Sequence, residues 1–182
     1  MYWRVISPRD GRFRGIYGDN MPYGPQEFLE LSDEIDEIDP RKLRFFASDD
    51  PGEDRKPVPD LSYSINGVLV MTPRSFLVLQ PLFASIKFKT YPGKLDDGSN
   101  CIVFCCLTEV SGFDFDRSKF EIFDDGDIIR VFDLKIVDGF TTNYNIFRLA
   151  DNWGPRFELV VSDRFFELCK RHNLTGLDFL PT

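Results

Sequence analysis

The C-terminal part of the chain contains an apolar run, a capped amphipathic segment and a second apolar run that ends at a proline, RFELVVSDRFFELCKRHNLTGLDFLP. Ser162 is a favourable N-cap, and Asp163 places a negative charge in the first helical turn, where the helix dipole favours it. Cations lie at the other end, followed by Asn173, which tolerates the left-handed conformation of a helix terminator. The segment predicts a strand, a helix over about 163–172 and a second strand.

An earlier segment, NGVLVMTPRSFLVLQPLF, follows the same plan of apolar strand, hydroxyl N-cap and aromatic-led helix. Thr72 is the predicted N-cap, and Pro73 takes the first helical position, where its missing N–H costs nothing. Pro81 is expected to kink or end this helix, predicted over about 73–83. An internal duplication and two independent units that obey the same capping rules both account for the likeness, and the few identities favour the second. The matching positions are Thr72 and Ser162, Arg74 and Arg164, and Phe76 and Phe166.

Most of the remaining chain is predicted to form strands. Alternating or continuous apolar residues occur in YWRVI, RKLRFFA, SINGVLV, SIKFKTYP, NCIVFCCLTEV, KFEIFD, DIIRVFDLKIV and YNIFRLA. The alternation in SIKFKTYP places Ile86, Phe88 and Thr90 inward. The long run NCIVFCCLTEV indicates a central strand covered on both faces.

Three Asp-Gly pairs predict turns between these strands, because glycine accepts a positive φ. They are Asp97-Gly98, Asp125-Gly126 and Asp138-Gly139. The last two separate neighbouring strand candidates and favour tight hairpins. The middle of the chain is therefore predicted to be mostly antiparallel sheet.

Together these elements predict an α+β fold, with a largely antiparallel sheet, two main packed helices and an irregular N-terminal portion. At 182 residues the chain is long enough for one full core. We expect a single domain over residues 1–182. A weak sub-boundary is expected near 48–60, where SDDPGEDRKPVPDLS has the composition of a surface loop.

The charge balance is acidic, with 30 Asp and Glu against 22 Lys and Arg, a net charge of −8 and a pI near 4.7. Phosphate binding needs a clustered basic surface, so this composition argues against a nucleic-acid partner. It favours a solvated acidic surface or attraction to a basic protein. No apolar run is long enough to span a bilayer, and the opening residues MYWRVISPRDGRFRG lack the layout of a secretory signal, so we expect no membrane partner.

Phenylalanine is the compositional outlier, with 19 residues beside 6 tyrosines and 2 tryptophans. This content predicts a core built largely on aromatic packing. Aromatic side chains left over for a partner are the alternative.

The four cysteines are Cys101, Cys105, Cys106 and Cys169. Three lie in one apolar run, where strand alternation turns Cys106 away from Cys101 and Cys105, and the fourth lies on the apolar side of the last helix. They are predicted to be buried free thiols in a reducing cytoplasm. There is no C-x-x-C pair and one histidine, so we expect no zinc site.

No residue pattern predicts a catalytic site, a metal site or a cofactor. His172 is the single histidine, and its place beside cations at a helix end favours capping over catalysis. Asp114 and Asp116 flank a phenylalanine and could bind a cation or a basic partner, but the Arg117-Ser118 pair that follows favours a hydrogen-bonded turn. FDDGD is similar to a fragment of a calcium loop, yet the later ligands are absent and a hairpin turn is favoured.

The most negative part of the chain is a run of acids before Pro40, interrupted by two isoleucines. Such a run is usually a solvated face, and it can also attract a basic protein. From charge alone, we expect it to be the partner-binding surface. Its acidic residues are Glu30, Asp33, Glu34, Asp36, Glu37 and Asp39.

The C-terminal segments resemble a known family. The tail from IFRL to DFLP is similar to the C-terminal signature of immunity protein family eleven, a bacterial family formerly catalogued as a domain of unknown function. The segment LVMTPRSFLVLQPLF resembles the first strand–helix unit of that family, and CCLTEVSGFDFDRSKF resembles its Asp-x-x-Ser segment. The likeness covers roughly residues 61–182. Its parts in the tail are Phe147-Arg148, Val160 to Ser162, Leu174-Thr175-Gly176 and Phe179.

This resemblance implies a cytoplasmic protein that binds and neutralises a cognate toxin of a bacterial polymorphic toxin system. It implies stoichiometric protein–protein binding without catalytic residues or a cofactor. From the negative net charge of the chain, we also expect the toxin to have a basic surface. Two alternatives stay open: a small hydrolase-like enzyme that acts on a toxin or its product, and a regulatory ligand-binding module unrelated to toxins.

Overall fold

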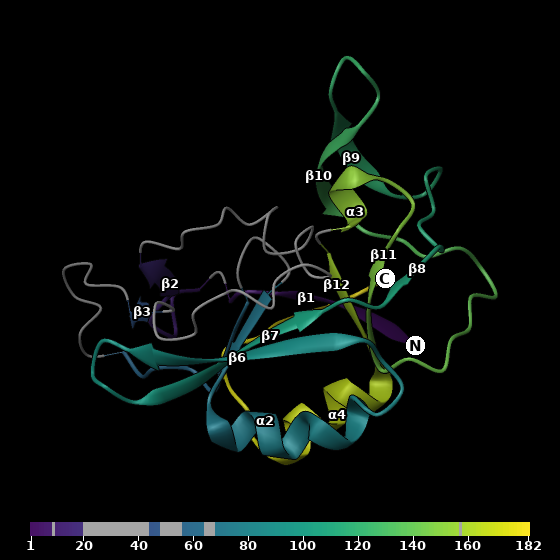
Figure 1. The fold of residues 1–182 in the computed structure, drawn as a ribbon. Helices are drawn as coiled ribbons and strands as arrows, with labels where there is room; N and C mark the ends of the chain where they lie inside the picture. Colours follow the sequence, from purple (N-terminus) through teal and green to yellow (C-terminus); the bar gives the residue numbers. More distant parts are fainter. Residues whose placement is uncertain (9, 20–43, 48–55, 64–67, 157) are drawn as a thin grey trace.

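The structure is a computed structural model that describes residues 1–8, 10–19, 44–47, 56–63, 68–156 and 158–182. Within this part of the chain, two sheets lie above a layer of two helices, and a two-stranded hairpin projects on the side opposite the helices (Figure 1). The architecture is α+β with mainly antiparallel sheets, as the sequence predicts.

The first sheet has five strands in the order β13-β1-β12-β11-β8. Its N-terminal strand β1 pairs on both sides with strands from the end of the chain, and Arg4 lies opposite Val160 on one side and Leu180 on the other. All neighbours are antiparallel except β8 and β11, which are parallel. The strands are β1 (Tyr2–Ile6), β8 (Glu109–Val110), β11 (Ile146–Leu149), β12 (Leu159–Ser162) and β13 (Asp178–Pro181).

The second sheet has six strands in the order β2-β3-β6-β7-β5-β4. The apolar strand β7 lies between β6 and β5, which confirms its predicted central place. One face of β7 buries Cys101, Val103 and Cys105, and the other buries Phe104 and Cys106. The strands are β2 (Ile16–Asp19), β3 (Arg44–Ala47), β4 (Leu61–Tyr63), β5 (Val68–Met71), β6 (Phe88–Leu95) and β7 (Asn100–Cys106).

The helix layer consists of α2 (Pro73–Leu79), which continues into a 3₁₀ helix η3 (Gln80–Leu82), and α4 (Asp163–Arg171). Pro81 ends the regular part of the first helix, as expected, because a proline has no N–H to donate. A short helix, α3 (Trp153–Arg156), lies between β11 and β12.

The predicted helix caps are confirmed. The Thr72 hydroxyl accepts the Ser75 N–H at 3.2 Å, and the Ser162 hydroxyl accepts the Phe165 N–H at 3.4 Å. Asn173 has φ +50°, so it takes the left-handed position that terminates α4.

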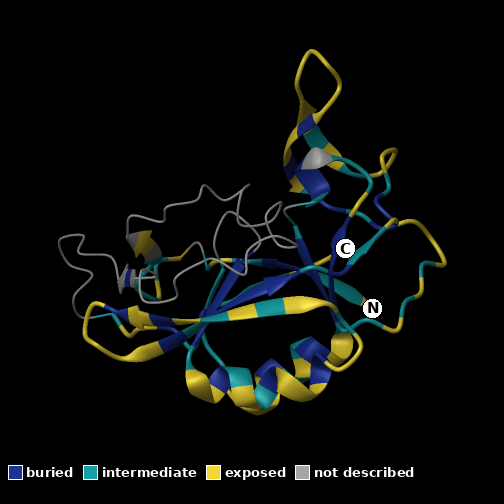
Figure 2. Ribbon diagram, in the orientation of Figure 1, coloured by how far each residue is buried: buried dark blue, intermediate teal, exposed yellow. Residues whose placement is uncertain are grey.

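Both sheets and both main helices share one apolar core. The side chains come from β1, β4, β5, β7, β11 and β12 and from the inner faces of the helices, as the dark blue bands in Figure 2 show. Phenylalanine dominates the largest buried side chains, which confirms the aromatic core. The fully buried phenylalanines are Phe83, Phe104, Phe147 and Phe165.

All four cysteines are free and buried, as predicted. Burial raises the pKa of the Cys105 thiol to about 12 and that of the Cys106 thiol to about 11. Both side chains therefore act as small apolar groups that fill the sheet.

The two strand–cap–helix units lie in matching places. The strand order β6-β7-β5-β4 with α2 after β5 corresponds to the order β13-β1-β12-β11 with α4 after β12. The register also corresponds: Leu61 opposes Met71 at the start of β4, and Ile146 opposes Val161 at the start of β11. In each unit the capping residue donates its N–H to the carbonyl before the first strand, Thr72 to Asp60 and Ser162 to Asn145.

Two predictions in the strand regions are wrong. Asp138-Gly139 forms a turn, but β10 and β11 on its two sides do not pair, because β11 pairs with β8 and β12 instead. Thr90 is exposed, because among the described residues the helix layer covers this face of β6 at Phe88, whose ring centroid lies 5.5 Å from that of Phe83, and Thr90 lies further along the strand. Phe88 is partly exposed but stacks on Phe104.

Gly176 joins the two sheets at a place where no side chain fits. Its φ is +99°, and a Cβ there would collide with the Leu61 carbonyl oxygen and with Pro59. Gly176→Ala should therefore lower the free energy of unfolding by about 3 kcal/mol or more, from backbone strain and from overpacking. Urea unfolding measures this change.

The matched control is Gly98→Ala in the β6–β7 turn, where φ is +83° but no atom lies within 4 Å of the added Cβ. This variant should lose only about 1 kcal/mol. Equal losses in the two variants would contradict the close contact at Gly176.

Candidate functional site

The acidic residues predicted to bind a partner, Glu30, Asp33, Glu34, Asp36, Glu37 and Asp39, lie outside the described residues. The candidate site is therefore built from the described part of the chain. Its two components are the projecting hairpin and a cavity at the base of that hairpin.

The hairpin consists of β9 (Lys119–Ile122) and β10 (Ile128–Asp133), joined by the predicted Asp125-Gly126 turn. It exposes four large apolar side chains, which is unusual for a segment of this length. The exposed fractions are 55% for Ile122, 50% for Phe123, 42% for Ile129 and 53% for Phe132 (Figure 2). Ile122 and Phe123 lie at the tip, and Ile129 and Phe132 lie along β10. Several exposed apolar groups on one projecting element are typical of an interaction surface.

The opposite side of the hairpin is anchored in the body of the protein. Phe120, Ile128 and Val131 pack in a second apolar cluster with residues of β11 and β12. The Ile128 N–H donates to the Asn152 carboxamide oxygen at 2.9 Å. Gly154 of α3 lies so close to the Ile128 carbonyl that no Cβ would fit. The exposed apolar side chains are thus carried by a fixed support.

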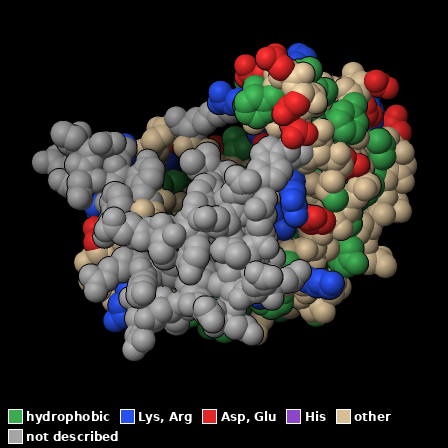
Figure 3. Space-filling view, turned by 45° about the horizontal axis from the view of Figure 1, so that its top comes forward, with side chains coloured by type: hydrophobic (Ala, Val, Ile, Leu, Met, Phe, Trp, Pro, Cys, Tyr) green, Lys and Arg blue, Asp and Glu red, His purple; other side chains and the backbone are tan. Residues whose placement is uncertain are grey.

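Acidic side chains surround the apolar tip. Glu121 and three aspartates of the turn, at positions 124, 125 and 127, are exposed. Figure 3 shows acidic side chains next to hydrophobic ones at the hairpin end of the molecule. The segment 119–133 contains five acids and two bases. Its apolar surface therefore carries negative charge.

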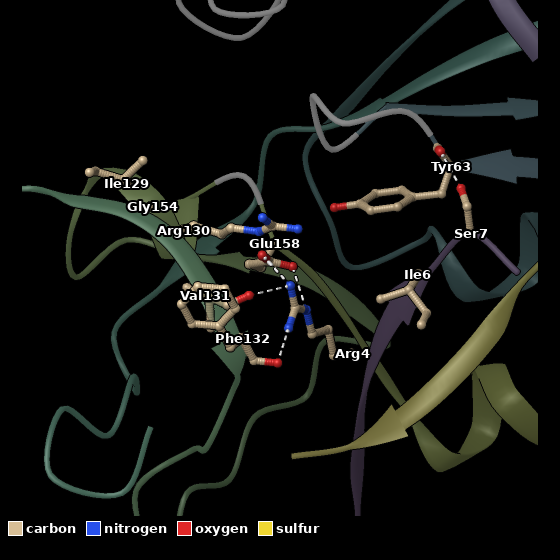
Figure 4. A pocket seen from close by; sticks show the side chains of 10 residues that line it. All are labelled: Arg4, Ile6, Ser7, Tyr63, Ile129, Arg130, Val131, Phe132, Gly154 and Glu158. Atoms are coloured by element: carbon tan, nitrogen blue, oxygen red, sulfur yellow. Dashed lines mark hydrogen bonds and ion pairs between the residues drawn. The ribbon is translucent and has the colours of Figure 1, made fainter. Parts of the chain in front are cut away.

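A cavity of about 740 Å³ lies between β1, Tyr63, β10 and the segment that enters β12 (Figure 4). Ile6, Tyr63, Ile129 and Phe132 form apolar and aromatic walls, and Arg4 and Glu158 lie at the base. The outer residues of β10 belong both to this cavity and to the exposed surface of the hairpin.

Arg4 and Glu158 form a bidentate ion pair in the cavity. The Arg4 Nε and Nη2 atoms each donate to a Glu158 carboxylate oxygen at 2.7 Å. The same guanidinium donates to the carbonyl oxygens of Val131 at 2.9 Å and Phe132 at 3.2 Å. Arg4 thereby connects β1 to the hairpin and to the entrance of β12.

Electrostatics in this region follow from burial. Burial raises the pKa of the Glu158 carboxyl, and the Arg4 guanidinium opposes that rise. Burial also raises the pKa of the Tyr63 hydroxyl, and the Glu158 charge raises it further. The Tyr63 hydroxyl oxygen accepts the Leu159 N–H at 3.2 Å, which fixes the ring against β12.

A second arginine is buried where the two sheets meet. Arg148 is only 2% exposed and pairs with Glu109 at 3.0 Å, and Arg156 pairs with the same carboxylate oxygen at 3.0 Å. The Arg148 Nε atom is the buried side-chain polar atom without a partner among the described residues. Burial lowers the pKa of Arg148.

The sequence did not single out Arg4 and Glu158. In the corresponding unit, their places are taken by Val103 and Val68, which are part of an apolar cluster. A charged residue inside each of two otherwise apolar segments, YWRVI and FELVV, is the signal in the sequence. The two charges are brought together only by the pairing of β1 with β12, which neither segment predicts by itself.

The other predicted positions have structural roles in the described part of the chain. The Asp114 carboxylate accepts backbone N–H groups of Asp116 and Arg117 at 3.1 and 2.9 Å and pairs with the Arg117 side chain, which confirms the predicted turn. These bonds hold the pKa of Asp114 below its usual value. His172 is the C-cap of α4, and its carbonyl accepts Arg74 Nη2 at 2.7 Å.

No family model matches the chain, and no curated protein matches it. None of the helices in the described part of the chain has the length and apolar character that a bilayer crossing needs. The hypothesis on function therefore starts from the geometry of the hairpin and the cavity.

The Arg4–Glu158 pair should show strong energetic coupling. Glu158→Gln leaves a buried guanidinium without its carboxylate and should lower the free energy of unfolding by about 3 kcal/mol. Arg4→Met with Glu158→Leu removes both charges, and this double variant should be more stable than the sum of the single changes predicts, by about 2 kcal/mol. Urea unfolding of the four proteins in this double-mutant cycle gives the coupling.

The exposed pair Arg12–Asp178, with an Nη2–Oδ1 distance of 2.6 Å, is the matched control. Its coupling should be much smaller, because water screens the charges. Equal coupling in the two cycles would show that burial does not determine the strength of the Arg4–Glu158 pair.

Proposed function

We propose that this protein is a non-catalytic binding protein that uses the β9–β10 hairpin to hold a basic protein partner. In our proposal, its biological role is the stoichiometric neutralisation of a bacterial toxin in the cytoplasm. The observation that carries the proposal is the set of exposed apolar side chains on an anchored, acidic hairpin.

The surface of the hairpin has the composition of a protein interface. Such interfaces combine an apolar and aromatic centre with a polar, hydrated rim. Ile122 and Phe123 supply the centre at the tip, and Ile129 and Phe132 extend it along β10. A few buried aromatic side chains usually carry most of the binding energy.

The support of the hairpin favours tight binding. Arg4 and the contact of Gly154 with Ile128 hold β10 in place before any partner arrives. A preorganised surface loses less conformational entropy on association than a mobile loop. The smaller entropy loss raises the affinity, and stoichiometric inhibition of a toxin needs a high affinity.

The charge determines the kind of partner. The hairpin segment has an excess of three acids, and the whole chain has a net charge of −8. Complementary charge mainly accelerates association and selects the partner. A toxin with a basic surface fits this chemistry.

The toxin role draws on the resemblance of the C-terminal motifs to immunity protein family eleven. In the fold the tail motifs lie in β11, β12, α4 and β13, which belong to the scaffold. The similar segment CCLTEVSGFDFDRSKF reaches the first two residues of β9, and the rest of the hairpin lies outside the similar motifs. A shared scaffold with a variable binding element is what a family that meets different toxins requires. The four free cysteines support a reducing compartment.

The hairpin tip should determine binding. Ile122→Ser with Phe123→Ser should weaken binding to the cognate toxin at least about tenfold, because the apolar centre of the interface is lost. Binding is measured by calorimetry, and protection by growth of cells that express the toxin. The unfolding midpoint should not fall, since both side chains are exposed.

Leu77→Ser is the matched control, because Leu77 on α2 is 66% exposed but lies far from the hairpin in the fold (Figure 1). It should leave binding and protection unchanged. Full protection by the hairpin variant would contradict the proposed interface. Protection at substoichiometric ratios would contradict a binding role and favour the enzyme alternative.

Charge reversal tests the acidic stretch separately. Changing Asp33, Glu34, Asp36 and Glu37 to Lys should slow toxin association, with a smaller effect on dissociation, and added salt should reduce the difference. Stopped-flow mixing measures both rates. An unchanged association rate would show that this stretch is not part of the interface. Charge reversal of the aspartates in the turn 124–127 tests the hairpin in the same assay.

A further inference from the structure

The cavity beside the hairpin has the size of a small-molecule site. Its volume of about 740 Å³ lies within the range of such sites, and its lining combines apolar walls with several polar groups. Ile6 and Ile129 provide aliphatic walls, and Tyr63 and Phe132 provide aromatic ones.

The charges at the base of the cavity neutralise each other. Both carboxylate oxygens of Glu158 accept from Arg4, and Arg4 Nη1 and Nη2 each donate to a carbonyl of β10. Both charged groups therefore already have hydrogen-bond partners, and neither needs a charged ligand. They provide a neutral and rigid base.

Arg130 is different, because it forms no ion pair among the residues that the structure describes. The side chain lines the cavity, and its guanidinium lies over the Phe132 ring at 5.3 Å from the centroid (Figure 4). Glu121 opposes it in the strand register, yet Arg130 forms no ion pair with any described residue. The aromatic ring contacts the guanidinium beside the cavity, and the paired N–H groups of a guanidinium match the two oxygens of a carboxylate.

We propose that this cavity binds a small carboxylic acid with an apolar body, whose carboxylate pairs with Arg130 and whose body lies against Phe132, Ile129 and Ile6. A single guanidinium without an ion-pair partner among the described residues fits a monoanion better than a phosphate, which needs more donors than one guanidinium offers. The site is independent of the hairpin tip and does not require the proposed toxin partner.

Phenylacetate and hexanoate are suitable probes, with phenylacetamide and hexanamide as uncharged controls of the same shape. Each is titrated to millimolar concentration into protein labelled at the isoleucine methyl groups. Both acids should shift the Ile6 and Ile129 signals saturably and leave Ile102, which lies outside the cavity, unchanged. The amides should bind at least about tenfold more weakly, because they lack the charge.

Arg130→Gln should abolish the preference for the acids over the amides. Arg164→Gln, which removes an exposed arginine of α4, should leave the preference intact. Retention of the Ile128 methyl signal shows that the hairpin of the Arg130 variant is folded. Ile122→Ser should bind the acids like the unchanged protein, so a failure of toxin binding is distinguishable from a failure of ligand binding.

Three results would overturn the proposal. The first is the absence of saturable shifts at Ile6 and Ile129 with either acid. The second is equal binding of acids and amides. The third is an unchanged preference in Arg130→Gln.

Discussion

The pairing of β1 with β12 and β13 is the constraint on which the rest of the structure depends. It brings the first residues of the chain between two strands near its end, and it is the most non-local contact of the fold. The register determines which side chains reach the cavity. In the observed register, Val5 faces the helices and Arg4 faces β10. A shift by one residue would exchange these faces, bury the guanidinium in the apolar core and separate it from Glu158.

The two related halves show where the molecule is free to vary. Both halves present apolar side chains to the helix layer, and Leu69 in one half corresponds to Leu159 in the other within one shared core. The opposite face differs. There the first half packs Val68 and Val103, and the second half places Glu158 and Arg4. The matching strand order and register extend beyond the helix caps, so they agree better with an internal duplication than with common capping rules alone.

Local chemistry made much of the scaffold predictable. Thr72 and Ser162 cap helices through contacts that span three residues, and glycine at a hairpin turn acts on its immediate neighbours. Such features can be read from a short window of sequence. The prediction for Asp138-Gly139 failed because strand pairing is not set by the turn alone. A turn forms there, but β11 pairs with β8 and with the next strand, β12, instead of with β10.

The candidate site was beyond local inference. Arg4 and Glu158 are 154 residues apart, and each is an isolated charge in its own segment. The exposure of the hairpin was equally hidden, because KFEIFD and DIIRVFDLKIV have the apolar content of core strands. The two faces of the hairpin differ only in their packing. Phe120 and Val131 belong to an apolar cluster on one side, whereas Phe132 on the other side is 53% exposed and has the Arg130 guanidinium over its ring.

The position of β10 connects the two proposed sites. Ile129 and Phe132 face the cavity and also belong to the exposed surface of the hairpin, whereas Ile122 and Phe123 lie at the tip. A ligand that packs against Phe132 alters the surface that a partner contacts along β10. Any effect of the ligand on partner affinity must then equal the effect of the partner on ligand affinity, because coupling between binding sites is reciprocal. The Arg4 bonds to the β10 carbonyls make the strand rigid, so such coupling would act through direct contact and charge at Phe132 and Arg130 rather than through movement of the hairpin.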